Sequence, residues 1–348
     1  MSIYWSDYVE SNCRQNYSYI ASSAFLKNAY HFTALFTIPL AIFTFYVIVR
    51  VTPRKMKNMK IPLLIAHAWT TNLDLMITVN VTPVIFFPSA AGLPSGLLGS
   101  IGFNAKWLAY FGQVSIIMNG VCFVILLENR HAQITTIKFK IQRKRTRLIY
   151  FGINYFLAFF LMLTFYMEES DQLELRQIVL KRIPCPTIDF YDKNAIVLLK
   201  GGELLPFLSI SGGLSIIVIQ SLFFALHTIY HLNVVKNAHI SEATKALQRK
   251  FLSYVAMQVM IPWTALVCPI LYSLYADSNN YYNQALNNIS MLLMACHGLM
   301  STLCTLFIMK PYRDFVKSVI MGSEEPDTKR LWATSVVRSQ ASMLGSVA

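Results

Sequence analysis

Seven long apolar segments are the feature that most restricts the fold of this chain. Each exceeds the roughly 18 residues that a membrane-spanning helix needs. The chain is also 55% hydrophobic and only 14% charged, whereas an average soluble domain is about 25% charged. We therefore expect an all-α membrane protein, a seven-transmembrane helix bundle. The segments lie at about 29–51, 61–87, 105–128, 148–167, 204–229, 251–275 and 287–309.

The distribution of basic residues predicts the orientation of this bundle. Of the 30 Lys and Arg residues, 22 lie in the polar segments on one side of the predicted membrane and 8 lie on the other. Cytoplasmic loops carry an excess of Lys and Arg. We therefore expect the N-terminus outside and the C-terminus inside, which agrees with an odd number of spans. The net charge of +13 then reflects membrane topology, and we expect no nucleic acid partner.

A short amphipathic helix is predicted directly after the seventh span. Pro311 suits a first helical position, the apolar residues from Tyr312 to Ile320 recur on one helical face, and Gly322 can end the helix. We expect this helix to lie on the inner leaflet of the bilayer. The chain then divides into an extracellular N-terminus (1–28), a seven-transmembrane domain (29–309), the juxtamembrane helix (310–322) and a disordered cytoplasmic tail (323–348).

The predicted outer side has two features of an exported surface. Asn16-Tyr17-Ser18 is a candidate glycosylation site. Cys13 and Cys185 are the only cysteines expected outside, where an oxidising environment permits a disulfide. Spacing alone leaves the pairing of these two cysteines open.

One carboxylate, Asp74, lies deep in a predicted span. An ionisable residue at membrane depth indicates a functional site by default, because burying its charge is costly. Asp74 could hold a cation or could be a hydrogen-bonded packing residue. His297 also lies in a span, but no second histidine or carboxylate lies three or four residues from it, as a metal site on one helix would need. We expect no metal and no cofactor. The possible packing partners of Asp74 are Asn72, Asn119 and Ser301.

The third span ends abruptly in Glu128-Asn129-Arg130-His131. Glu128 and Arg130 are two residues apart and project in different directions from a helix, so they do not face each other. Arg130 is better placed to pair with the sixth or second helix. The alternative is an ordinary basic helix end on the cytoplasmic side. In the sixth span, Pro262 beside Trp263 is a candidate hinge, or a fixed kink.

Aromatic and polar residues in the outer part of the third span indicate a binding site. Trp107, Tyr110 and Gln113, together with Phe207 and Trp263, could line a small-molecule pocket that opens outward. Aromatic residues at this depth can instead be anchors at the membrane interface.

Catalytic motifs are missing from the sequence, which has no GxSxG, Walker or HExxH pattern. We therefore expect no enzyme. An inverted repeat with broken helices would indicate a transporter, and none is visible. A small membrane transporter or channel remains the alternative to a receptor.

Several short motifs follow one another in a distinctive order. The order is Thr52-Pro53-Arg54-Lys55-Met56-Lys57, His67, Trp69, Leu73-Asp74-Leu75, Glu128-Asn129-Arg130-His131, Pro184-Cys185-Pro186, Gln248-Arg249-Lys250-Phe251, His297-Gly298-Leu299-Met300-Ser301-Thr302 and Pro311-Tyr312-Arg313. In this order the chain resembles the nematode serpentine receptors of class H, from about Tyr30 to Val319. These are chemoreceptors of the seven-helix G-protein-coupled type.

The resemblance implies a plasma-membrane receptor of chemosensory neurons, placed at the sensory cilium. It also implies an odorant-like small ligand, sensory signal transduction and a heterotrimeric G protein as partner. The candidate residues for coupling or activation are then Glu128, Arg130, Asp74, Pro262 and His297. The chain departs from rhodopsin-like receptors in three places. Asn129 separates the acid from the arginine, the third helix has no outer cysteine, and the seventh has no Asn-Pro-x-x-Tyr motif.

Overall fold

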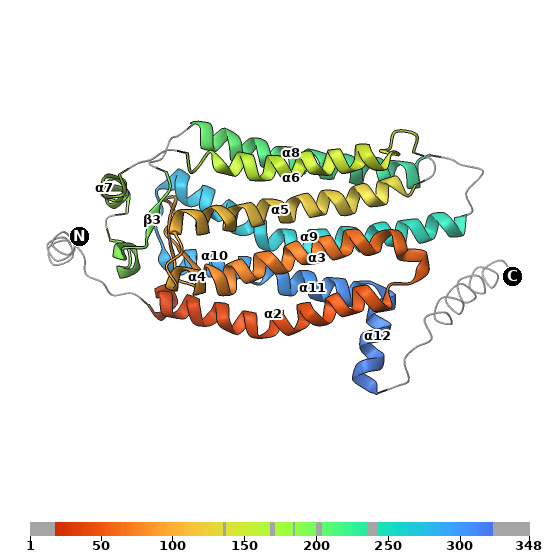
Figure 1. Cartoon of the computed structure of the whole chain (residues 1–348), viewed down its shortest axis with the longest axis horizontal. Coiled ribbons are helices and arrows are strands. Elements are labelled where there is room, and N and C mark those ends of the chain that lie inside the picture. Colours follow the sequence, from red (N-terminus) through yellow and green to blue (C-terminus); the bar gives the residue numbers. More distant parts are fainter. Residues whose placement is uncertain are drawn as a thin grey trace.

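The computed structural model describes residues 18–322, apart from 135–136, 168–170, 184, 200–203 and 236–241. In this part of the chain, long helical segments lie side by side in one elongated bundle (Figure 1). They correspond to the seven predicted spans. The segments are α2 (Ser23–Val51), α3 (Lys57–Leu75) with the π-helical turn η3 (Met76–Asn80), α5 (Ala105–Ala132), α6 (Lys144–Leu163), α8 (Leu204–Asn233), α9 (Glu242–Asn279), and α10 (Gln284–Ala295) followed by α11 (His297–Ile308).

Five of these segments are long and apolar enough to cross a membrane, counted over the described residues: α2, α5, α6, residues 211–233 of α8, and α10 with α11. α5 is the central helix of the bundle. In its apolar 18-residue stretch, 67% of the residues are buried inside the protein, against 17% in the corresponding stretch of α6. α6 therefore presents most of its apolar surface outward, as a lipid-facing helix does.

Side chains also cap helix starts: Asn104 accepts from the Lys106 amide at 2.9 Å, and Ser22 accepts from the Phe25 amide at 3.1 Å.

The second predicted span is wrong at its end. We expected helix through residue 87, but η3 ends at Asn80 and the chain enters strand β1 (Pro83–Ile85). Pro83 has no amide hydrogen for a helix, and Thr82 before it has a positive φ of 38°. The connection that leads on to α5 contains strand β2 (Ala91–Pro94) and the single turn α4 (Leu97–Ser100).

A small antiparallel sheet is thus an exception to the all-α expectation. β1 pairs with β2, and β2 pairs with β3 (Ile196–Val197), in the order β1-β2-β3. The sheet lies at one end of the bundle together with α7 (Gln172–Arg182), and we call this the sheet end (Figure 1).

The opposite end carries α12 (Lys310–Met321), and we call it the α12 end (Figure 1). α12 occupies the range expected for the amphipathic helix, with a proline at its start and Gly322 left-handed (φ 61°) at its end. The first half of its apolar face, including Tyr312 and Phe315, is buried, whereas Val319 and Ile320 are exposed. The first half of α12 therefore packs against the bundle, and the exposed Val319 and Ile320 in its second half can contact another apolar surface.

Candidate functional site

The outer-span candidates do not all converge on one point. The Tyr110 hydroxyl donates to the Phe159 carbonyl at 3.0 Å, and Gln113 Oε1 accepts from the Tyr166 hydroxyl at 2.9 Å. The rings of Tyr110 and Tyr166 lie 5.5 Å apart. Trp107, in contrast, is 49% exposed, which fits an interface anchor. The structure therefore joins Tyr110 and Gln113 through Tyr166, a residue that the sequence analysis missed.

The remaining binding candidates are less closely defined. Trp263 is half-buried and packs against the main apolar core. Phe207 lies in α8 and Pro262 in α9, but their side chains are outside the described part of the chain. Cys13 and Asn16 also lie outside the described residues.

The Asp74 carboxylate is buried between α3 and α11. Its Oδ1 lies 3.4 Å from His297 Nδ1. A Cβ atom added at Gly298 would stand 1.7 Å from Asp74 Oδ2. Only glycine leaves room for this carboxylate, so α11 approaches α3 closely at this point. Among the described residues, the neighbours of the carboxylate are thus His297 and Gly298 of α11, and not the expected Asn72, Asn119 or Ser301.

His297 connects Asp74 to the central helix. Asn119 Oδ1 accepts from the Thr70 hydroxyl at 3.2 Å, so the Asn119 amide nitrogen faces His297 Nε2, at 2.8 Å, as a donor. The other ring nitrogen, Nδ1, lies 3.2 Å from the Met294 carbonyl oxygen and is the nitrogen nearer to Asp74. This chain of polar groups links α3, α5 and α11. We call Thr70, Asp74, Asn119 and His297 the buried polar cluster.

The charged end of α5 forms an ion pair with α6. Glu128, 1% exposed, accepts from Arg147 Nε of α6 at 2.8 Å and also pairs with Arg147 Nη2. Arg147 reaches Asn129 Oδ1 as well, at 3.2 Å. Arg130 is buried and donates to Gln133 Oε1 at 3.2 Å. As expected from their spacing, Glu128 pairs away from Arg130.

Three histidines also meet at this end of the bundle. His131 Nε2 lies 2.8 Å from His227 Nδ1, and the rings of His227 and His231 are 4.7 Å apart. The spacing of His227 and His231 by four residues was visible in the sequence, but their approach to His131 was not. Among the described residues, no group of three or more His, Cys, Asp or Glu side chains has the geometry to hold a metal ion.

Tyr312 attaches α12 to the end of α2. Its hydroxyl lies 2.8 Å from the Thr52 hydroxyl. Burial raises the pKa of Tyr312 to about 12, and the bond to Thr52 opposes this shift. The phenol is therefore neutral at physiological pH and serves as a hydrogen-bonding group.

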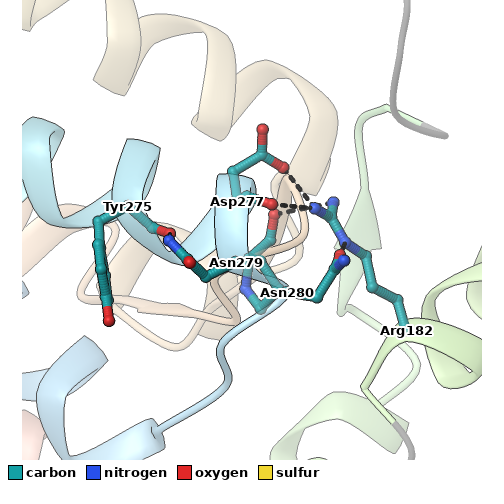
Figure 2. Close-up of polar contacts among 6 residues, drawn as sticks. Arg182, Tyr275, Asp277, Asn279 and Asn280 are labelled. Carbon is teal, nitrogen blue, oxygen red and sulfur yellow. Dashed lines mark hydrogen bonds and ion pairs between the residues drawn. The ribbon is translucent and has the colours of Figure 1, made fainter.

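A guanidinium joins three parts of the sheet end (Figure 2). Arg182, at the end of α7, donates through Nη2 to the Asp277 carbonyl at 2.8 Å and to Asp277 Oδ1 at 2.6 Å. Its Nε donates to Asn280 Oδ1 at 2.7 Å, and its Nη1 to the Pro88 carbonyl at 3.3 Å. α7 is thereby tied to the end of α9 and to the β1–β2 connection.

Cys185 follows shortly after α7 and is disulfide-bonded. Four cysteines in the helices are free: Cys122, Cys268, Cys296 and Cys304. The partner of Cys185 lies outside the described residues, so its pairing with Cys13 stays a prediction.

The comparison with protein families decides what kind of protein this arrangement belongs to. The family described as "Serpentine type 7TM GPCR chemoreceptor Srh" matches residues 21–322. The chain belongs to this family. The Srh family is a family of receptors, not enzymes, and its members are seven-transmembrane proteins. This Srh chain is also similar to "Serpentine receptor class H-72" of Caenorhabditis elegans, with 26% identity over 340 residues, which cover 97% of this chain and 98% of that relative.

Proposed function

We propose that this Srh chain is a chemosensory receptor that binds an odorant-like small molecule from outside and activates a heterotrimeric G protein inside. The sheet end faces the exterior, and the α12 end faces the cytoplasm. Residues 1–28 are extracellular, 29–309 form the receptor domain, 310–322 lie at the membrane and 323–348 form the cytoplasmic tail. The receptor acts in the plasma membrane of the sensory cilium of chemosensory neurons.

The position of the basic residues carries this proposal. The segments that contain 22 of the 30 Lys and Arg residues include the α2–α3 and α5–α6 connections and α12. The described parts of these segments lie at the α12 end (Figure 1). Basic loops are retained on the cytoplasmic side during insertion. The α12 end is then the surface available to a G protein.

Ligand binding and coupling need a connection through the bundle. Tyr110, Gln113 and Tyr166 lie toward the sheet end and supply aromatic and polar groups for a small ligand. The buried polar cluster joins α3, α5 and α11 in the middle of the bundle. A ligand shifts the bundle toward an active form only if it binds that form more tightly. We assign this shift to a rearrangement of the buried polar cluster.

Two measurements test the proposal. An epitope tag before Ser2 should bind antibody on intact cells, whereas a tag after Ala348 should bind only after permeabilisation. Calcium imaging of cells that express the receptor, against an odorant panel, should then give responses that depend on an added G protein. A tag at the C-terminus that stains on intact cells would contradict the orientation. Movement of a labelled compound across receptor-containing vesicles without any G protein would favour a transporter.

A further inference from the structure

An uncompensated basic patch lies where the α5–α6 connection enters α6. It consists of Lys138, Arg143, Lys144 and Arg145, all of them exposed. No Asp or Glu occurs between Ile137 and Tyr150. Within the described part of the chain, none of the four side chains makes an ion pair. Arg147, which faces inward, forms an ion pair with Glu128. It therefore differs from the four exposed cations of the basic patch, which have no such partner among the described residues.

The basic patch lies on the lipid-facing side of α6. Lys144 and Arg145 precede Leu148 and Ile149 by four residues each, which places each cation one turn from an apolar residue on the same helical face. Leu148 is 74% and Ile149 is 62% exposed, as expected for residues in contact with acyl chains. The two cations therefore stand at the boundary between acyl chains and headgroups.

Phe139 adds an apolar anchor beside these charges. It is 77% exposed and packs edge-on against Phe223 of α8, with ring centroids 6.3 Å apart. Phe223 is itself 42% exposed, on a helix that also faces outward. An exposed aromatic ring between Lys138 and Lys140 is well accommodated in the interfacial region of a bilayer.

The start of α6 also lacks compensation for its positive charge. Arg143, the residue before the helix, forms no side-chain cap, and no acid lies in the first turn. Cations at a helix N-terminus oppose the helix dipole. Phosphate oxygens would satisfy both the free amides and the side-chain charges.

We propose that the basic patch and Phe139 bind an anionic phospholipid with a phosphate-bearing headgroup. The headgroup contacts Lys144 and Arg145 at the start of α6, and Phe139 inserts beside the acyl chains. Clusters of Lys and Arg next to a membrane helix bind phosphoinositides and phosphatidylserine in this way. The patch continues the lipid-facing surface of α6 and α8, which favours a lipid over a protein partner.

The test uses the purified full-length receptor and requires neither odorant nor G protein, so it is independent of the proposed function. Short-chain phosphatidylinositol bisphosphate is titrated, and its apparent affinity is taken from the rise in the unfolding temperature. Short-chain phosphatidylcholine and free inositol trisphosphate are the comparison probes. We expect the bisphosphate lipid to bind most tightly, since only this probe combines acyl chains with an anionic, multiply phosphorylated headgroup.

Three variants locate the site. Lys144→Gln with Arg145→Gln should weaken lipid binding about 25-fold, from about fivefold for each charge removed. The matched control, Arg54→Gln with Lys57→Gln, removes two exposed charges from the α2–α3 connection at the same end and should change binding little. Phe139→Ser should weaken binding of the lipid without changing binding of inositol trisphosphate.

Several outcomes would overturn the proposal. Equal losses in both double variants would indicate unspecific attraction by net charge. If phosphatidylcholine binds as tightly as the bisphosphate lipid, the anionic headgroup does not contribute to binding. If inositol trisphosphate binds as tightly as the bisphosphate lipid, the site binds soluble phosphates. If Lys144→Gln with Arg145→Gln leaves lipid binding unchanged but lowers G-protein activation in phosphatidylcholine nanodiscs, the patch docks a protein instead.

Discussion

Glu128 of α5 is paired with Arg147 of α6 and not with Arg130, two residues further along its own helix. The Glu128 side chain is almost completely buried, whereas Arg147 keeps 31% of its side chain exposed. Loss of Arg147 would therefore leave a buried charge unpaired, whereas loss of Glu128 would leave a partly solvated charge. This asymmetry determines what each substitution should do.

Replacing Arg147 should destabilise the receptor. Arg147→Ala leaves a buried carboxylate without its cation. Breaking a fully buried pair in this way costs roughly 3–5 kcal/mol, and the cost is lower here because Arg147 is partly exposed. Arg145→Ala removes an exposed charge two residues away and should cost less than about 0.5 kcal/mol. Thermal unfolding of the purified receptor compares the two. Equal stability of both variants would show that Glu128 is neutral or solvated without Arg147.

Gly298 should tolerate no side chain. Gly298→Ala brings a methyl group onto the Asp74 carboxylate, 1.7 Å from Oδ2, and should cost at least about 2 kcal/mol through overpacking. Gly112→Ala in α5 is the matched control, because nothing lies within 4 Å of an added Cβ there. That variant should be neutral or more stable by about 0.5–1 kcal/mol, since alanine favours helix. A harmless Gly298→Ala would mean that α3 and α11 are further apart than described.

Arg182 should hold the sheet end together without contributing much to global stability. Its ion pair with Asp277 is partly exposed, and such pairs contribute about 0–1 kcal/mol. Arg182→Ala should nevertheless speed amide hydrogen exchange in α7 and at the end of α9, because the same guanidinium joins both. Lys181→Ala, next to it, is the control. Unchanged exchange in Arg182→Ala would show that the apolar core alone positions α7.

Cys185 should be linked to Cys13. Mass spectrometry of non-reduced peptides should recover the two residues in one fragment. Cys185→Ser and Cys13→Ser should lower surface expression to the same extent, because losing a native disulfide costs about 2–5 kcal/mol. Cys268→Ser, which removes a free cysteine, should not. Two free thiols at Cys13 and Cys185 in folded receptor would refute the pairing.

The sequence predicted the long helices well because bilayer thickness fixes their length and composition. α12 begins at Lys310, next to the proline that predicted its start. The sheet escaped prediction because its strands are only two to four residues long and because β3 pairs with β2 from a distant part of the chain. Likewise, Asp74 was recognised as an acid at membrane depth, but the burial of Glu128 was not predicted, and the partners of both depend on how separate helices pack. His131 and His227, for example, meet across 96 residues.

Arg130 provides the sharpest test of activation. It is buried at the α12 end and bonded to Gln133. If Arg130 changes partners between resting and active forms, Arg130→Ala should reduce G-protein coupling at least about tenfold, a loss of about 1.4 kcal/mol in the active form. Ligand binding and surface level should stay close to normal, because Lys138, Lys140 and Arg143 still retain this loop in the cytoplasm.

The measurement for Arg130 is the ligand-evoked calcium or cyclic-nucleotide response, divided by the amount of receptor at the surface. Arg143→Ala removes an exposed cation from the same region and controls for the loss of charge alone. A reduced response in Arg130→Ala with a normal response in Arg143→Ala would support a partner change at this residue. Normal responses in both variants would mean that Glu128-Asn129-Arg130 is an ordinary helix end. The residues that stabilise the active form would then lie elsewhere in the bundle.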